Sequence, residues 1–297
     1  MLISHNPNAG ARDTYNDVKR LAELLRRQRL EVEIFTDLDL VTQRANDLVD
    51  QRQLRALVGV GGDGTAAELV NRTKVGTTLT LFPTGNENLL ARYFHFDAIP
   101  EHLAETIAHG SLIRIDAGKA EGRIFLLMAS CGLDAEVVRC VHDRRTGHMS
   151  SRNYFKPLWD VVRTFKYPEL RVYCDEGLGM DAGAPFLTAH WFSVFNLPCY
   201  GGGLEFAPHA AGNDGQLDLC GFRRGGFWHF LRYVSAVYLR QHQHMSDWIT
   251  RRVNRVRIVS DVPVHYQLDG DPGGLLPLNI EVLPNRLNIL VPKKAVG

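Results

Sequence analysis

The first part of the chain alternates short apolar runs with stretches in which apolar residues recur at helical spacing. The runs that predict strands are residues 2–4, 32–36, 56–60 and 78–82. Between the first two runs, Val18, Leu21 and Leu25 fall on one side of a helix, while Arg20 and Arg26 face water. Strands that alternate with helices predict an open parallel sheet covered by helices, which is an α/β domain.

From about Leu112 the pattern changes to apolar runs that are typical of antiparallel strands. These runs are residues 124–129, 170–174, 187–196, 216–222, 256–259, 264–268, 278–283 and 287–291. Two segments with helical spacing interrupt them, at residues 154–165 and 227–238. We therefore predict two domains, an α/β domain over residues 1–120 and a β-rich domain over residues 121–285.

A glycine cluster, Gly61-Gly62-Asp63-Gly64-Thr65, directly follows the third predicted strand. Glycine lets the backbone turn sharply and approach a ligand closely. Thr65 and Glu68 have the spacing of a capping box, which predicts a helix start whose free N–H groups face the loop. A helix start favours anions, so the cluster predicts a phosphate site, although a plain tight turn between strand and helix remains the alternative. The pattern is not a Walker A motif.

Two more polar loops follow predicted strands of the same sheet. Asn6-Pro7-Asn8-Ala9-Gly10 comes after the first strand, and Thr84-Gly85-Asn86-Glu87-Asn88 comes after the fourth. Thr36 ends the second strand. Because parallel strands present their carboxyl ends at one edge, where open α/β sheets bind ligands, we expect these loops to contribute to one site.

Taken together, these segments resemble the diacylglycerol kinase catalytic-domain family, which includes bacterial lipid kinases and sphingosine kinases. The glycine cluster is shared with NAD kinases and phosphofructokinases, so it is less specific than the motifs of the second half. Those motifs are Gly132–Val137, Tyr200–Gly203, Pro208–Ala210, Asp214–Asp218 and Leu268–Asp271. Their order along the chain favours a lipid kinase over the other members of the superfamily.

The resemblance implies a fold and a nucleotide site. The fold is a three-layer α/β domain similar to that of NAD kinases and phosphofructokinases, then an antiparallel β-sandwich, with residues 286–297 returning to the first domain. ATP and Mg²⁺ are the implied cofactors. The residues implied at the ATP site are Asn6, Pro7, Asn8, Ala9, Gly10, Thr36, Gly61, Gly62, Asp63, Gly64, Thr65, Ala66, Ala67 and Asn86.

Three carboxylates are candidates for the chemistry. Asp271 occupies the glutamate position of the family's Asp-Gly-Glu motif and is the implied proton acceptor, with Asp269 as its rival. From local sequence alone, Asp269-Gly270 also predicts an ordinary β-turn. We expect Asp63, within the glycine cluster, to help hold catalytic Mg²⁺ directly or through water.

A second metal site is implied by the resemblance near Asp214-Gly215. It would bind a structural Mg²⁺ through the Asp214 carboxylate and the main-chain carbonyls of Ala211 and Gln216. A single carboxylate is a weak anchor, so an Asp-Gly turn without metal is the alternative.

The chain departs from the family pattern at two places. Gly85–Leu89 reads Gly-Asn-Glu-Asn-Leu where Gly-Thr-Gly-Asn-Asp is usual, so a hydroxyl and a carboxylate are replaced. Asp271 is one methylene shorter than glutamate, which changes its reach by roughly an ångström.

Composition narrows the setting of the protein. Its 34 Lys and Arg balance 33 Asp and Glu, which gives no reason to expect a nucleic-acid partner. Five cysteines without a CxxC pair argue against a disulfide framework. No apolar stretch is long enough to span a membrane, so we expect a cytoplasmic protein that meets its lipid through peripheral membrane contact. The sequence leaves the oligomeric state open, a homodimer included.

Residues 227–238 allow two interpretations. The aromatic Trp228, Phe230 and Tyr233, with Arg224 and Arg232 nearby, fit a membrane contact. The same spacing is what a core-packing helix shows, and that interpretation is favoured.

The leading functional hypothesis is an ATP-dependent kinase that phosphorylates a hydroxyl of a diacylglycerol or a sphingoid base. An NAD-kinase-like or other small-molecule kinase would share the glycine cluster but should lack the Tyr200–Leu217 pattern. A non-catalytic relative that binds lipid or nucleotide is the third hypothesis, which the departures at Asn86–Leu89 and Asp271 suggest.

Overall fold

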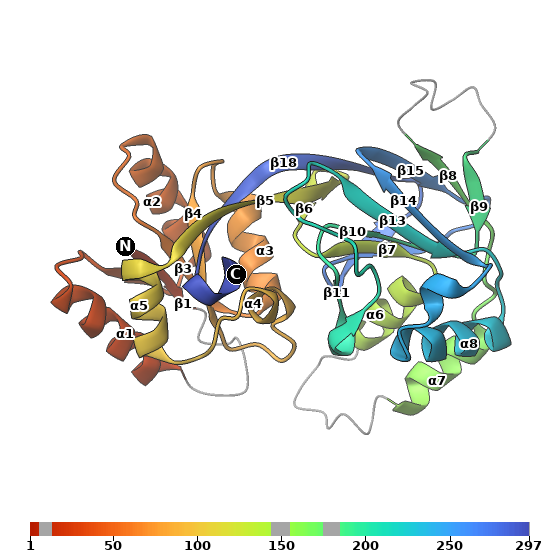
Figure 1. Cartoon of the computed structure of the whole chain (residues 1–297), viewed down its shortest axis with the longest axis horizontal. Helices are drawn as coiled ribbons and strands as arrows, with labels where there is room; N and C mark the ends of the chain where they lie inside the picture. Colours follow the sequence, from red (N-terminus) through yellow and green to blue (C-terminus); the bar gives the residue numbers. More distant parts are fainter. Residues whose placement is uncertain (6–13, 144–154, 175–184, 297) are drawn as a thin grey trace. The chain divides into compact units, whose positions relative to one another are not determined.

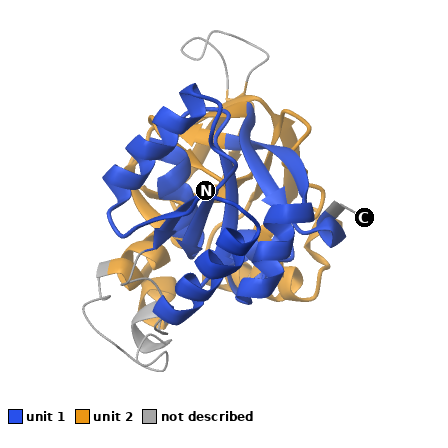
Figure 2. Cartoon of the chain, turned by 90° about the vertical axis from the view of Figure 1, so that its left-hand side faces the viewer, with its two compact units in different colours: residues 1–117, 201–203, 284–297 blue, residues 118–200, 204–283 orange. Residues whose placement is uncertain are grey.

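The computed structural model describes residues 1–5, 14–143, 155–174 and 185–296. The chain divides into two compact units, which Figure 2 distinguishes by colour. The first consists of residues 1–117, 201–203 and 284–297, and the second of residues 118–200 and 204–283. Each unit has its own sheet architecture.

The first unit is built on a parallel sheet. In spatial order its strands are β2 (Glu33–Phe35), β1 (Leu2–His5), β3 (Leu57–Gly61), β4 (Thr78–Pro83) and the last part of β18 (Leu278–Val291). β18 pairs in parallel with β4 through Asn288 and Ile289. β1 and β3 are buried along their whole length, as expected for inner strands of a parallel sheet whose two faces are covered.

Helices cover both faces of this sheet (Figure 1). Two of them, α1 (Tyr15–Arg27) and α5 (Pro100–His109), pack against each other. α2 (Leu38–Asp50) and α3 (Asp63–Arg72) also pack against each other, and the short α4 (Leu89–Tyr93) follows β4. Val18, Leu21 and Leu25 of α1 are buried, so the helical stripe in the sequence is confirmed.

The second unit contains two layers of antiparallel strands. One layer, in spatial order, consists of β14 (Trp248–Val253), β13 (Leu217–Phe222), β10 (Trp191–Phe195), β7 (Met128–Cys131), β16 (His265–Leu268) and β17 (Asp271–Leu275). The other consists of the first part of β18, β15 (Arg255–Val259), β8 (Leu170–Cys174) and β9 (Leu187–Ala189), with β6 (Arg123–Phe125) and the end of β5 (Ser111–Ala120) alongside. Apolar residues from both layers form one core, Phe125, Leu170, Phe192, Leu219 and Leu278 among them. The predicted fold class, an α/β domain followed by a β-sandwich, is confirmed.

Helices α6 (Leu133–Asp143), α7 (Phe155–Thr164) and α8 (Phe227–Tyr238) complete the second unit, with the small β11 (Cys199–Tyr200) and β12 (Leu204–Glu205) pair. The two helices predicted from spacing are confirmed. α6 and β14 were not predicted, because α6 begins within a short polar motif and β14 contains two consecutive arginines, Arg251 and Arg252.

Three predicted strand boundaries are wrong in an informative way. The run 124–129 is split into β6 and β7, and the run 187–196 into β9 and β10. In both cases the chain passes from one layer of the sandwich to the other in the middle of an apolar run. The runs 278–283 and 287–291 belong instead to one continuous strand, β18. Apolar periodicity indicates burial but not the layer to which a residue belongs.

Phe222 should be a principal anchor of the second unit. Its ring is fully buried and stacks on Tyr233 at 3.9 Å between centroids. Phe222→Ala should lower the free energy of unfolding by about 3–5 kcal/mol, because it leaves a large cavity in a packed core. Urea unfolding followed by tryptophan fluorescence measures this. Phe186→Ala, at a ring that is 46% exposed, is the matched control and should cost less than about 1 kcal/mol. Equal losses would contradict the assignment.

Candidate functional site

The glycine cluster ends β3 and opens α3, but not through the predicted capping box. α3 begins at Asp63 with Gly62 as its N-cap, and no side chain caps it. Thr65 lies within the first turn, where it packs so closely on Gly61 that a Cβ there would come 2.1 Å from the Thr65 hydroxyl. Glu68 pairs with Arg72 at 2.9 Å instead of reaching back. The capping-box prediction is wrong because the helix starts three residues earlier than a cap at Thr65 requires.

The loop after β4 packs directly on the glycine cluster. Thr84 N–H donates to the Gly61 carbonyl at 3.0 Å. A Cβ on Gly85 would lie 2.7 Å from the Gly62 Cα, so this close approach requires glycine. Asn88 closes the loop, since its side-chain oxygen accepts from Gly85 N–H at 2.9 Å and its amide donates to the Gly85 carbonyl at 2.7 Å. The two loops therefore form one structural element.

Asp63 ties the start of α3 to the start of α4. Its two carboxylate oxygens accept the backbone N–H groups of Leu89 and Leu90, each at 2.9 Å. Burial raises the pKa of the Asp63 carboxyl, although the two backbone hydrogen bonds oppose that shift. The carboxylate therefore holds the start of α4 against the start of α3.

The other predicted nucleotide residues have different places. Asn6–Gly10 lie outside the described residues. Ala66 and Ala67 are buried in α3, whereas Asn86 is exposed in the loop after β4. Thr36 is exposed after the edge strand β2, with β1 between it and β3. The structure therefore brings the Gly61–Thr65 and Thr84–Asn88 segments together, while Thr36 lies two strands away.

The start of α3 suits a phosphate group. The first N–H groups of a helix have no acceptor within the helix, and they carry the positive end of its dipole. A Cβ added to Gly64 would meet no atom within 4 Å, so space is open beside these N–H groups. Backbone donors and open space fit the phosphates of a nucleotide.

In the second unit, Asp269 accepts hydrogen bonds from the backbone of the bend between β6 and β7. Its carboxylate accepts three consecutive N–H groups, those of Leu126 at 2.6 Å, Leu127 at 2.8 Å and Met128 at 2.9 Å. Asp269 itself has a positive φ of 51°. The predicted turn is present, and the lone pairs of this carboxylate are largely committed to the bend.

Asp271 has a more open position on the same turn. Its carboxylate pairs with Arg123 at 3.1 Å, and 36% of its side chain is exposed. Gln267 accepts the Gly270 N–H at 2.7 Å, which fixes the turn between the two aspartates. Asp271 can therefore meet a ligand while its position is held.

The loop of the implied structural metal has oxygen donors of the right kind. Asp214 accepts the Gln216 N–H at 3.0 Å, and the Ala211 carbonyl accepts from Asn213 at 2.7 Å. The Arg252 guanidinium lies 3.7 Å from the second Asp214 oxygen. Oxygen ligands suit Mg²⁺, but the Arg252 guanidinium already neutralises the charge of the Asp214 carboxylate. The loop therefore fits a bound Mg²⁺ only in part. Among the described residues, no group of three His, Cys, Asp or Glu side chains is placed to hold a metal.

An apolar cavity of about 270 Å³ lies in the second unit. Leu133 and Val137 of α6, Trp159 of α7, and Phe230 and Val234 of α8 line it. Asp134 is its one charged lining residue within the described chain. The cavity was not predicted, because its walls come from segments far apart in the sequence.

Hydrogen bonds fix the polar end of this cavity. The Tyr200 hydroxyl donates to Asp134 at 2.6 Å, and Gln267 donates to the other Asp134 oxygen at 3.2 Å and to Ser130 at 2.8 Å. Burial and the neighbouring Asp134 hold the pKa of Tyr200 well above its ordinary value, so this hydroxyl keeps its proton. Asp134 and Tyr200 lie within the motifs Gly132–Val137 and Tyr200–Gly203, but the sequence alone assigns a role to neither.

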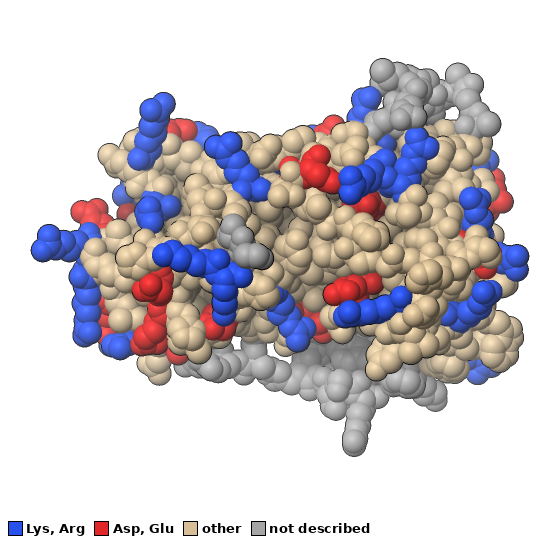
Figure 3. Space-filling model, viewed as in Figure 1, with Lys and Arg blue, Asp and Glu red and all other residues tan. Residues whose placement is uncertain are grey.

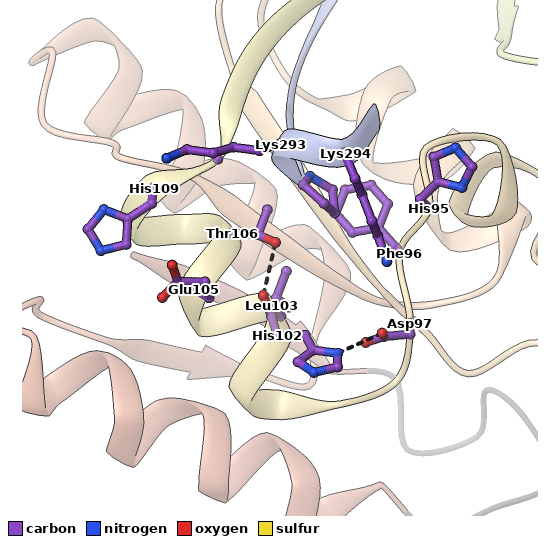
Figure 4. A pocket seen from close by; sticks show the side chains of 12 residues that line it. His95, Phe96, Asp97, His102, Leu103, Glu105, Thr106, His109, Lys293 and Lys294 are labelled. Carbon is purple, nitrogen blue, oxygen red and sulfur yellow. Dashed lines mark hydrogen bonds and ion pairs between the residues drawn. The ribbon is translucent and has the colours of Figure 1, made fainter. Parts of the chain in front are cut away.

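A second cavity, of about 350 Å³, lies in the first unit between α5 and the residues that follow β18 (Figure 4). His102 bonds Asp97 at 2.7 Å on its wall. Lys293 and Lys294 contribute positive charge, and Glu105 negative charge. Because charges of both signs line it and it shares no residue with the glycine cluster, we assign it no ligand.

Two family models match consecutive parts of the chain. The diacylglycerol kinase catalytic domain matches residues 1–120. The YegS C-terminal NAD kinase beta sandwich-like domain matches residues 128–291. Together they include the glycine cluster, the turn at Asp269 and the residues of the apolar cavity.

Relatives named diacylglycerol kinase and solved structures agree with these models. The diacylglycerol kinase of Bacillus subtilis is 26% identical, and the match covers 98% of this chain and 96% of that protein. The diacylglycerol kinase of Staphylococcus carnosus is 23% identical, over 98% and 94%. A diacylglycerol kinase structure from Bacillus anthracis shares the fold with a TM-score of 0.70 at 17% identity, over 99% and 97%. An NAD kinase from Archaeoglobus fulgidus in complex with ATP has a TM-score of 0.55 at 15% identity, over 99% and 94%.

Asp63 should make the free energy of unfolding depend on pH, and the Asp63→Asn variant should lose this dependence. Because burial raises the pKa of this carboxyl, the folded chain binds a proton at a pH where the unfolded chain has released it. The free energy of unfolding should therefore fall as pH rises from about 4, the ordinary Asp value, through the raised pKa. Asp63→Asn should flatten this slope, measured by urea unfolding at a series of pH values. Parallel profiles would contradict the raised pKa.

Asp269 should matter for stability. In Asp269→Asn one acceptor oxygen is replaced by a donor, so buried N–H groups at the bend lose their partner. The free energy of unfolding should fall by about 2–4 kcal/mol. The control is Asp261→Asn, at an ion-paired carboxylate that is 80% exposed, which should cost less than about 1 kcal/mol. If Asp269→Asn lowered the free energy of unfolding as little as Asp261→Asn does, the bend would not depend on the Asp269 carboxylate.

Proposed function

The chain belongs to the diacylglycerol kinase catalytic-domain family, and we propose that it is an ATP-dependent kinase acting on a hydroxyl of a diacylglycerol- or sphingoid-type lipid. The observation that carries the proposal is the apolar cavity of the second unit, with Asp134 at its polar end. A small polar acceptor would find few partners among the apolar and aromatic side chains of this cavity. A lipid chain would bury apolar surface there.

The polar end of the cavity suits an alcohol. Tyr200 donates to one Asp134 oxygen, while Gln267 and Ser130 donate to the other, so the carboxylate is held in one orientation. A carboxylate accepts hydrogen bonds only, so it favours a ligand that donates, such as a hydroxyl or an ammonium group. A sphingoid base offers more than one such donor next to a long apolar chain. A diacylglycerol has one free hydroxyl, which would have to leave Asp134 before its proton passes to Asp271.

The phosphate donor is assigned to the first unit. ATP is a substrate whose phosphates would lie against the N–H groups at the start of α3 and beside Gly64. The Asp63 carboxylate and the Gly62–Gly85 contact hold this loop in one conformation. A backbone that is positioned in advance reduces the ordering that binding would otherwise require.

Asp271 is proposed as the proton acceptor. The acceptor oxygen forms its bond to the γ-phosphorus, the bond to the bridging oxygen of ADP breaks, and the hydroxyl proton passes to the Asp271 carboxylate. Asp271 is preferred to Asp269 because three backbone N–H groups already occupy Asp269. Arg123 holds the Asp271 carboxylate on the turn.

Two sites for Mg²⁺ complete the proposal. When bound, the metal neutralises charge on the transferred phosphate. Asp63 is the proposed ligand near the phosphates, directly or through water, while Ala211, Asp214 and Gln216 form the proposed structural loop. Arg252 would have to turn away from Asp214 for a cation to bind there. Of the described helices, none is long and apolar enough to cross a membrane, and we propose peripheral contact from the cytoplasm.

The test is transfer of label from γ-labelled ATP with Mg²⁺ to a short-chain diacylglycerol or a sphingoid base in detergent micelles. We expect label in the organic phase. Label in a water-soluble product instead, with NAD or a cell extract as acceptor, would favour an NAD-kinase-like activity. ATP binding without transfer to any acceptor would favour a non-catalytic relative.

Two variants locate the activity within the structure. Asp271→Asn should lower kcat by at least about 100-fold, since it removes the proton acceptor, while the exposed Asp261→Asn keeps it. Val137→Phe, which fills the cavity, should raise the KM for lipid and leave the KM for ATP unchanged. Full activity in Asp271→Asn would exclude that residue as the base, and an unchanged lipid KM in Val137→Phe would place the acceptor elsewhere.

A further inference from the structure

Helix α8 is apolar on the side that faces away from the core. Tyr233 and Val237 are buried, which confirms the core-packing interpretation for one side of the helix. On the other side Trp228 is 79%, Tyr238 75% and Leu239 64% exposed. A helix that packs on a core by one side normally carries polar residues on the other. The exposed side of α8 therefore lacks the composition of a solvent-facing surface.

We define the α8 outer face as Trp228, Leu231, Val234, Tyr238 and Leu239. With about 100° between successive residues, these positions share one half of the helix. Arg232 and Ser235 are the polar residues among them. Single exposed apolar residues scattered over a surface are ordinary. Several that share one face of a helix form a continuous apolar patch, and such a patch marks an interaction site.

The charges around this face are mostly positive. Basic and acidic side chains are interspersed over the side of the molecule in Figure 3, so that side has no large surface of one charge. Arg224 and Arg232 share one acidic partner, the buried Asp247, at 3.2 and 3.7 Å. Arg240 lies 3.5 Å from Glu205. Arg223 has no ion-pair partner within the described part of the chain, so the four arginines exceed their two acidic partners.

The apolar cavity opens beside the same face. Val234 belongs to the outer face and also lines the cavity, and it is 37% exposed. Trp159 of α7 lines the cavity too and is 40% exposed, with its ring edge-on to Phe227 of α8 at 5.4 Å. Side chains that are both lining and exposed mark the mouth. A molecule that covers the α8 outer face therefore lies next to the entrance of the cavity.

We propose that the α8 outer face docks on the surface of an anionic phospholipid bilayer. Tryptophan and tyrosine favour the boundary between water and hydrocarbon, and arginine favours anionic head groups. A second copy of this chain fits the face less well, because a two-fold contact would bring the same arginines together. The choice of a bilayer rests on the proposed function, since a lipid acceptor would then enter the cavity from the membrane that α8 touches.

Flotation of the whole protein with vesicles tests the inference without nucleotide or acceptor lipid. The vesicles are phosphatidylcholine mixed with phosphatidylglycerol, against phosphatidylcholine alone. The wild type should bind the anionic vesicles more tightly, and less so as salt increases. The double variant Trp228→Ala, Leu239→Ser, at two residues outside the lining of the apolar cavity, should bind at least about tenfold more weakly.

The matched control is Val75→Ser, Leu112→Ser, which removes two apolar residues of the first unit that are 68% and 57% exposed. It should bind vesicles as the wild type does. Arg223→Gln should weaken binding to anionic vesicles and leave binding to neutral ones unchanged. All three variants should unfold at the wild-type temperature, since the replaced side chains are exposed.

The outcomes separate this inference from the proposed function. Undetectable vesicle binding by the wild type, or equal binding by the double variant, overturns the docking surface. Wild-type dimerisation that the double variant loses, with vesicle binding unchanged, assigns the face to a second copy and also overturns it. The double variant should phosphorylate a short-chain acceptor in micelles at the wild-type rate. Inactivity of the wild type in that assay would count against the kinase proposal and leave the vesicle result standing.

Discussion

The second unit depends on a single carboxylate that receives three consecutive backbone N–H groups. At the bend between β6 and β7 the chain leaves one layer of the sandwich and enters the centre of the other. Backbone N–H groups at such a crossing need acceptors outside the ladders, and buried N–H groups without acceptors are costly. Asp269 supplies the acceptors from the turn between β16 and β17. One side chain thus joins the crossing of the layers to the turn that presents Asp271.

In the first unit, Asp63 likewise accepts backbone N–H groups from a neighbouring segment. Its carboxylate accepts two N–H groups at the start of α4, so the loop after β4 is held against the glycine cluster. In both units a carboxylate of a functional motif therefore organises backbone that lies near a candidate site. An aspartate in such a motif can be indispensable to the fold whatever its part in the chemistry.

Much of the architecture could be predicted from the sequence, and the exceptions have physical causes. Buried strands such as residues 57–61 read as apolar runs, and α1 shows its buried stripe at helical spacing. Apolar runs could not show where the chain changes layers near Leu126 or His190, because residues on both sides of each change are buried. The spacing of Thr65 and Glu68 resembled a cap, but the space needed by Thr65 beside Gly61 was visible only in three dimensions.

The candidate site could be predicted where one short segment forms it. The glycine cluster and the aspartate turn are each continuous in sequence. The loop after β4 lies against the glycine cluster as expected, whereas Thr36 lies two strands away. The apolar cavity is different, because α6, α7, α8 and β10 each contribute a few ordinary side chains. The α8 outer face could not be predicted either, because the spacing of apolar residues does not show which side of the helix is buried and which is exposed. Asn6–Gly10 lie outside the described residues and stay a prediction.

The hydrogen bonds of Gln267 also bear on how the product of the proposed reaction would leave. Its amide spans from Gly270 to Ser130 and Asp134, so both of its ends are used and Asp134 is kept in one orientation. A phosphorylated lipid carries negative charge on the group that would return to this carboxylate. Like charges repel strongly where little water screens them. The polar end of the cavity would then bind a neutral or cationic head group more tightly than an anionic one, which would favour release of a phosphorylated product.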